Sequence, residues 1–306
     1  MIFCRGSSSK NQISMRVLII GASGFIGSAL RSVFGAEAVG TYCHHPIDGL
    51  LPLDMRDAAA VERLFREIQP ELIIHPAAQP HVDWCEDHVQ ESYDVNVLGT
   101  RNVATAARAA GARYVFFSTD YVFNGDSGPY REDARPDPPN VYGRHKLEAE
   151  RLIADTLDNF VIARVCGVYG FERLGKNFVM ALLAKGRRGE PMNLPSDQWG
   201  NPTYADNLSA AVQELALSSH RGTFHVVGPE HVDRVSFARL ACGVFGLDPA
   251  FLRPRATAEL GQRAPRPLRG GLDAAKARGV LSTALLAPRQ GLELMKQRLQ
   301  AEGMMA

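Results

Sequence analysis

Residues 16–27 read Arg-Val-Leu-Ile-Ile-Gly-Ala-Ser-Gly-Phe-Ile-Gly, a short apolar run followed by glycines at every third position. Because the run is aliphatic throughout, it predicts a strand covered on both faces, and residues 24–34 predict the helix that follows. Gly21 permits a tight turn, Gly24 lets a diphosphate approach the backbone, and Gly27 lets the helix pack close to the strand. The stretch predicts a dinucleotide-binding loop; a glycine-rich turn in another kind of α/β protein is the alternative.

Strands and helices alternate along the chain beyond this loop, which predicts an α/β fold with a doubly wound parallel sheet of the Rossmann type. We expect a dinucleotide-binding domain over residues 15–166. Residues 167–306 are less regular and predict a smaller, mainly substrate-binding region with some segments returning to the sheet. Residues 1–14 are polar, and we expect a disordered leader or a remnant there. The expected strands are 38–43, 72–75, 113–118 and 160–165, and the expected helices are 57–68, 89–110, 142–157 and 291–299.

The composition excludes several classes of function. Lys and Arg total 34 against 33 for Asp and Glu, so no net field would draw the chain to nucleic acid or to an anionic membrane. The five cysteines are scattered and form no Cys-x-x-Cys, which argues against a disulfide framework or a zinc site and favours the reducing cytoplasm. No apolar run approaches the roughly 20 residues that span a bilayer.

Tyr142 and Lys146 stand four residues apart at the start of a predicted helix, so they share one face. An ammonium beside a phenol favours the phenolate, and a pKa lowered by about 3 units corresponds to roughly 4 kcal/mol. Tyr142 would then act as an acid or base near neutral pH. The alternative is an ordinary surface pair of Tyr and Lys.

Further motifs occur in the order and spacing of one known family. They are Leu53-Asp54, His75-Pro-Ala-Ala78, Asn96-Val-Leu-Gly-Thr100, Ser118-Thr-Asp-Tyr-Val-Phe123, Tyr142-x-x-x-Lys146, Gln198-Trp-Gly-Asn-Pro-Thr203 and Arg266-Pro267. With the glycine loop, they make the chain resemble the extended short-chain dehydrogenase/reductase family, and within it the dTDP-4-dehydrorhamnose reductase group. The resemblance covers nearly everything from Arg16 onward.

The resemblance implies three catalytic residues. Tyr142 would give a proton to a substrate carbonyl as hydride arrives from the nicotinamide. Lys146 would lower the pKa of Tyr142 and hold the nicotinamide ribose, and Thr119 would hydrogen-bond the carbonyl oxygen. The implied cofactor-binding residues are Gly21, Ser23, Gly24, Phe25, Ile26, Gly27, Asp54, Met55, Ala77, Ala78, Asn96, Ser118, Tyr142 and Lys146.

The cofactor preference depends on the segment after the second expected strand. No acidic residue follows Gly40 until Asp48, so nothing there repels a 2′-phosphate. Thr41, His44 and His45 can contact such a phosphate, which favours NADP(H) and leaves NAD(H) as the second cofactor. The alternative is that both histidines are solvated loop residues. A magnesium ion is associated with the reductase group, and we assign no residue to it.

The candidate substrate residues come from four segments. In the dehydratases of the family, the motif at this position resembles Thr-Asp-Glu, whereas this chain has Thr119-Asp120-Tyr121 and so lacks their carboxylic acid. An epimerase would need a second base, which we do not identify. Trp199 would stack on a base or sugar, or else cap the core, and Arg266 would bind phosphate, or else be solvated. The candidates are His81, Val82, Asp83, Thr119, Asp120, Tyr121, Trp199 and Arg266.

Residues 81–88 contain His, Asp, Cys and Glu side chains, but their irregular spacing does not fit a zinc site, and we expect no metal there.

We expect an NAD(P)-dependent oxidoreductase that reduces the 4-keto group of a nucleotide-activated 6-deoxysugar. The reaction that we expect first is the conversion of dTDP-4-dehydrorhamnose to dTDP-L-rhamnose. The alternatives are another nucleotide-sugar 4-ketoreductase or epimerase, or a non-catalytic regulatory subunit resembling the methionine adenosyltransferase β subunit. The nucleotide sugar is the expected partner, and a homodimer is left open.

Overall fold

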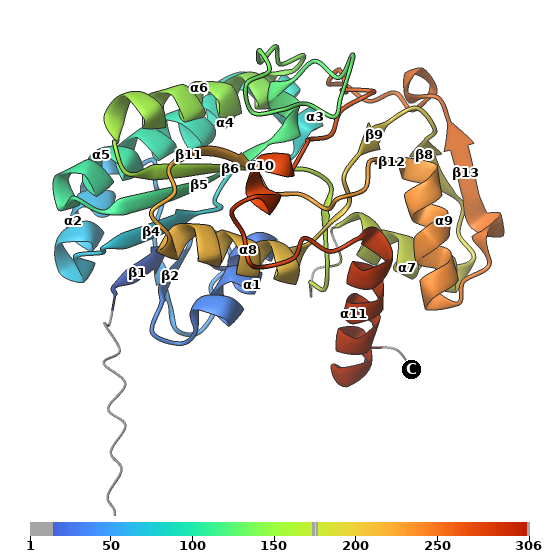
Figure 1. The fold of residues 1–306 in the computed structure, drawn as a ribbon, viewed down its shortest axis with the longest axis horizontal. Coiled ribbons are helices and arrows are strands. Elements are labelled where there is room, and N and C mark those ends of the chain that lie inside the picture. The colour runs from blue at the N-terminus through green and yellow to red at the C-terminus, as the bar shows by residue number, and fades with distance from the viewer. Residues whose placement is uncertain (1–14, 173–174, 176, 305–306) are drawn as a thin grey trace, which may run out of the picture.

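The computed structural model describes residues 15–172, 175 and 177–304; the expected leader lies outside them. Its centre is a parallel sheet of seven strands in the order β11-β6-β5-β4-β1-β2-β3 (Figure 1). The strands are β1 Val17–Ile19, β2 Val39–Tyr42, β3 Leu50–Pro52, β4 Leu72–His75, β5 Arg113–Thr119, β6 Phe160–Val165 and β11 Gly222–His225. The doubly wound Rossmann sheet is therefore confirmed. The sequence analysis missed β3, which is three residues long and lies at the sheet edge.

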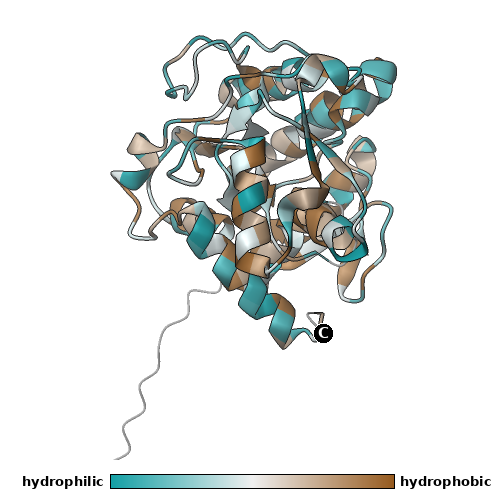
Figure 2. Ribbon diagram, turned by 90° about the vertical axis from the view of Figure 1, so that its right-hand side faces the viewer, coloured by the Kyte–Doolittle hydropathy of each residue, from teal (hydrophilic) through white to brown (hydrophobic). Residues whose placement is uncertain are grey.

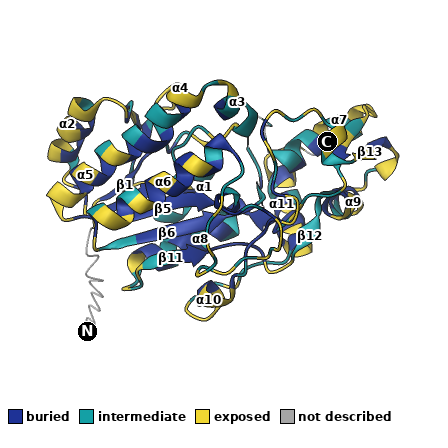
Figure 3. Cartoon of the chain, turned by 90° about the horizontal axis from the view of Figure 1, so that it is seen from above, coloured by how far each residue is buried: buried dark blue, intermediate teal, exposed yellow. Residues whose placement is uncertain are grey.

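Helices cover both faces of this sheet, so its strands are buried on both sides, as Figure 3 shows for β5 and β6. One face packs on α1 and α8, and the other packs on α2, α5 and α6. A Cβ at Gly27 would lie 2.1 Å from the carbonyl oxygen of Gly21, which confirms the close approach of α1 to the loop. These helices are α1 Phe25–Phe34, α2 Ala58–Ile68, α5 Thr100–Ala110, α6 Val141–Thr156 and α8 Ala205–Leu217.

The expected helix over 89–110 is divided into three parts. Helix α4 Val89–Tyr93 leads into a π-helical turn, Asp94–Gly99, and α5 follows; a short helix α3, Val82–Asp87, precedes them. The π-helical turn carries Asn96, whose side-chain Oδ1 accepts from the backbone N–H of Gln79 at 2.9 Å. The irregular turn thereby fixes the loop that follows β4.

The C-terminal lobe forms a separate cluster of apolar side chains around α7, α9 and α11 (Figure 1). The expected amphipathic helix is confirmed as α11, with Leu292, Met295 and Leu299 buried, and Figure 2 shows hydrophilic and hydrophobic residues alternating along it. No helix in the described ranges is long and apolar enough to cross a bilayer. The lobe and its connections contain β7 Val168–Tyr169, α7 Phe178–Arg188, β8 Met192–Pro195, β9 Trp199–Gly200, β10 Thr203–Tyr204, β12 Val232–Asp233, α9 Arg234–Phe245, β13 Leu252–Arg255, α10 Ala275–Arg278, α11 Pro288–Ala301 and the 3-10 turns Pro249–Phe251 and Thr257–Glu259. A further 3-10 turn, Asp120–Val122, directly follows β5.

Candidate active site

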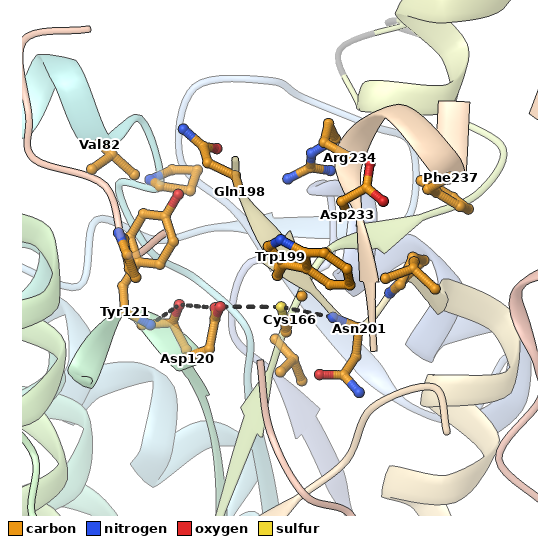
Figure 4. A pocket seen from close by; sticks show the side chains of 18 of the residues that line it. Val82, Asp120, Tyr121, Cys166, Gln198, Trp199, Asn201, Asp233, Arg234 and Phe237 are labelled. Atoms are coloured by element: carbon orange, nitrogen blue, oxygen red, sulfur yellow. Dashed lines mark hydrogen bonds between the residues drawn. The ribbon is translucent and has the colours of Figure 1, made fainter. Parts of the chain in front are cut away.

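A cavity of about 240 Å³ lies between the carboxyl ends of β5 and β6 and the C-terminal lobe. In open α/β sheets, ligands bind outside the carboxyl ends of the strands, so this is the expected place for chemistry. Figure 4 shows its residues approaching from both lobes. The candidates that line it are Val82, Ser118, Thr119, Asp120, Tyr121, Tyr142 and Trp199.

Tyr142 is held in the first turn of α6. Asn140 caps this helix, its side-chain oxygen accepting from the backbone N–H of Gly143 at 2.8 Å. A Cβ at Gly143 would lie 2.1 Å from the carbonyl oxygen of Tyr121, so only glycine lets α6 approach the turn after β5 this closely. The rings of Tyr121 and Tyr142 meet edge to face, with 6.1 Å between their centroids.

Lys146 follows one turn later and is 2% exposed, with its Nζ 3.8 Å from the ring centroid of Phe116. Burial lowers the pKa of Lys146 to about 7, although the charge of Glu150 acts the other way.

The pKa of Tyr142 is raised, chiefly by burial, while hydrogen bonding with the Thr119 side chain opposes that rise. The expectation that the pKa of Tyr142 is lowered is therefore wrong for this structure, because burial disfavours the phenolate more than the hydrogen bond with Thr119 favours it. A raised pKa keeps the proton on the phenol, which suits a group that donates it.

A chain of hydrogen bonds runs across the floor of the cavity (Figure 4). Thr119 Oγ1 accepts from the backbone N–H of Tyr121 at 3.1 Å and donates to Asp120 Oδ1 at 3.2 Å. The thiol of Cys166 donates to Asp120 Oδ2 at 3.1 Å and accepts from the backbone N–H of Asn201 at 3.4 Å. Burial raises the pKa of Asp120. Sequence reasoning gave no role to Cys166 or to Asn201, although Asn201 stands in the motif over residues 198–203.

The remaining substrate candidates are not in the lining of this cavity. The backbone N–H of Ala264 and the guanidinium of Arg266 both donate to Asp83 Oδ1, at 3.0 and 2.8 Å. Arg266 lines a separate surface hollow beside Trp199, and His81 is exposed just before α3. Arg266 and Asp83 therefore pair with each other, which leaves each less available to a ligand.

A second hollow, of about 350 Å³, lies over the carboxyl ends of β1, β2 and β4 and is lined by seven of the candidate cofactor residues. Gly21, which lines the hollow, has a φ of +85°, and α1 begins four residues later at Phe25. Ser118 Oγ, at the end of β5, is buried without a hydrogen-bond partner among the described residues. These features fit a bound dinucleotide. The candidates lining the hollow are Gly21, Thr41, His44, Asp54, Met55, Ala77 and Ala78, while Ser23, Gly24, Phe25, Ile26 and Gly27 form the turn into α1.

Two cofactor candidates use their side chains within the protein. Thr41 is 1% exposed, and its Oγ1 accepts from the backbone N–H of Gly21 at 3.0 Å. Asn96 bonds the backbone of Gln79. Sequence reasoning also missed Arg56, which lines the hollow and pairs with Asp54 at 2.6 Å. Its position two residues after Asp54 is the signal that could have identified it.

Comparison with known proteins places the chain in a family. Residues 15–301 match the family described as RmlD substrate binding domain. The chain belongs to this family. The resemblance inferred from the motifs is thus confirmed, and with it the extended short-chain dehydrogenase/reductase fold.

Three relatives illustrate the range of the family. The chain is 34% identical to the spore coat polysaccharide biosynthesis protein SpsK of Bacillus subtilis, over 81% of this chain and 85% of the relative. It is 32% identical to methionine adenosyltransferase 2 subunit beta of Xenopus tropicalis, over 85% and 81%. The crystal structure of dTDP-4-dehydrorhamnose reductase from Bacillus anthracis in complex with NADP superposes with a TM-score of 0.84 at 32% identity, covering 93% of this chain and 99% of that one.

Proposed function

We propose that this protein is an NAD(P)H-dependent oxidoreductase that reduces the 4-keto group of a nucleotide-activated 6-deoxysugar, converting dTDP-4-dehydrorhamnose to dTDP-L-rhamnose. The observation that carries the proposal is the convergence of Thr119 and Tyr142 at one end of a cavity, beside Tyr121 where a dehydratase has a glutamate. The related Bacillus anthracis reductase supports the same chemistry.

The residues divide the reaction among them. When bound, the reduced nicotinamide supplies a hydride to the carbonyl carbon. Tyr142 donates its proton to the carbonyl oxygen, so that the ketone becomes an alcohol and Tyr142 is left as phenolate. The Thr119 hydroxyl, which donates to Asp120 Oδ1 in this structure, turns its proton to the same oxygen as negative charge develops on it. Lys146, one turn along α6, stabilises that phenolate and holds the ribose.

We favour NADP(H) as the cofactor, with NAD(H) as the second choice. Three features support this preference. No carboxylate follows β2 directly, and both His44 and Arg56 line the hollow where the adenosine end would bind. The complex of the related reductase contains NADP. We assign no residue to Mg²⁺; within the described ranges no three His, Cys, Asp or Glu side chains gather as a metal site would require.

A regulatory subunit is the second candidate, because the chain is 32% identical to methionine adenosyltransferase 2 subunit beta over 85% of its length. Such a protein would keep the fold and the catalytic motifs without turnover.

The unpaired cysteines of the described part support a reducing compartment, and we propose the cytoplasm.

One assay separates these candidates. The purified chain is given NADPH or NADH with dTDP-4-dehydrorhamnose, and separately with its unepimerised 4-keto precursor. Rapid oxidation of NADPH with the first sugar alone supports the proposal. Oxidation with neither sugar, despite NADPH binding and stable co-purification with a methionine adenosyltransferase, would favour the regulatory role.

A further inference from the structure

Arg234 brings a positive charge into the active-site cavity from the C-terminal lobe. It is the first residue of α9 and lines the cavity with Gln198 and Trp199. Among the described residues that line this cavity, it is the only Lys or Arg. In Figure 4, Trp199 lies between Arg234 and Asp120, so the cation is across the cavity from the catalytic end.

No carboxylate of the described residues forms an ion pair with the guanidinium of Arg234. Its guanidinium lies over the ring of Phe178, with Cζ 4.8 Å from the ring centroid. The adjacent Asp233 caps α9 instead, accepting from the backbone N–H groups of Val235 and Ser236, each at 2.9 Å. Arg266 differs in this respect, because it is paired with Asp83.

We propose that Arg234 binds the diphosphate of the nucleotide-sugar substrate. This inference rests on the proposed function and names the residue that recognises the nucleotide part. In such a substrate, the diphosphate lies between the reacting sugar and the base. With the sugar at Tyr142 and Thr119, the diphosphate extends past Trp199 toward the guanidinium, whose fork can make two parallel hydrogen bonds to phosphate.

Calorimetric titration of the full chain with nucleoside diphosphates tests this role. The probes are dTDP and UDP, each compared with its nucleoside, thymidine or uridine. Arg234→Met should weaken the binding of the preferred diphosphate roughly 10- to 100-fold and leave nucleoside binding unchanged, because a charge-assisted phosphate contact is lost. Arg239→Met is the matched control, since Arg239 is exposed on the same helix. NADPH affinity should be unchanged in both variants.

Three results would overturn the inference, and they are distinguishable. Equal diphosphate binding by the wild type and Arg234→Met would refute the contact between Arg234 and the diphosphate and leave the proposed function standing. An equal loss for diphosphate and nucleoside would show that Arg234 acts by packing on Phe178. A wild type that binds NADPH but neither diphosphate would refute the inference together with the proposed function.

Discussion

The guanidinium of Arg266 donates to the carboxylate of Asp83 at 2.8 Å, joining helix α3 to a segment 183 residues further along the chain. The backbone N–H of Ala264 donates to the same oxygen, and Asn140 donates to the carbonyl oxygen of Pro265 at 2.9 Å. These hydrogen bonds position residues 263–267 at the edge of the active-site cavity, which Pro267 lines. These contacts join α3 and the start of α6 to residues 264–266 beside the cavity.

Breaking this ion pair should loosen the cavity edge. Asp83→Asn keeps an acceptor for Ala264 but removes the charge, so we expect a severalfold rise in KM for the sugar nucleotide with little change in kcat. The free energy of unfolding should fall by at most about 1 kcal/mol, because the pair is partly exposed. Asp87→Asn, which breaks the more exposed pair with Arg263, is the control. An unchanged KM for Asp83→Asn would contradict the prediction.

Tyr142→Phe removes only the proton that the mechanism requires. We expect a loss of kcat of at least about 100-fold with unchanged NADPH affinity, because the ring is retained. Steady-state turnover and fluorescence titration of NADPH measure the two quantities. Tyr121→Phe, which changes the facing ring, should lower kcat much less. Near-normal turnover by Tyr142→Phe would refute its role as the acid.

Lys146 should make the protein less stable near neutral pH. Its pKa falls from 10.5 in the unfolded chain to about 7 in the folded one, so below pH 7 folding buries an ammonium at a cost on the order of 5 kcal/mol. Between pH 7 and 10.5 the unfolded state binds the extra proton, and the cost shrinks as the pH rises. Lys146→Met should therefore stabilise the fold more at pH 7 than at pH 9.5, as measured by urea unfolding. An equal gain at both pH values would contradict this.

Arg56 should contribute to the cofactor preference. Its Nε and Nη2 donate to Asp54 at 2.6 to 3.0 Å. Its other N–H groups have no acceptor in the part of the chain that the structure describes, so they can reach a 2′-phosphate beside His44. We expect Arg56→Ala to weaken NADPH binding about 10-fold and NADH binding little, as measured by fluorescence titration. Arg63→Ala, exposed on α2, is the control. An equal loss of affinity for NADPH and NADH would show that the 2′-phosphate does not bind at Arg56.

His75 and Tyr114 form a buried pair whose coupling is measurable. Nδ1 of His75 is hydrogen-bonded to the hydroxyl of Tyr114, and both residues are fully buried. His75→Phe should cost about 1–3 kcal/mol of unfolding free energy, since it leaves the phenol without a partner. Adding Tyr114→Phe should recover part of that loss. Strict additivity in the double-mutant cycle would show that the pair is not coupled.

Several elements could be predicted because their signals are local. The aliphatic run before Gly21 predicts β1, and the apolar spacing in residues 57–68 predicts α2. The helix over 89–110 was predicted as continuous, because sequence periodicity does not reveal the π-helical turn through which Asn96 bonds Gln79. Tyr142 and Lys146 were found because one helix carries both, whereas the direction of the Tyr142 pKa depends on burial that spacing does not contain.

The alternation of strands and helices along the sequence is enough to predict the doubly wound sheet. The glycine loop and the helix carrying Tyr142 and Lys146 can also be predicted, because each follows from side chains within about one helical turn or one strand. The folded structure is needed to see that Asp83 pairs with Arg266, that Cys166 donates to Asp120, and that Arg234 enters the cavity with no carboxylate partner among the described residues. Pairing and burial depend on which distant segments the sheet and the lobe bring together. Charge and hydrogen-bonding capacity can be read from residue type, but their partners are set by packing.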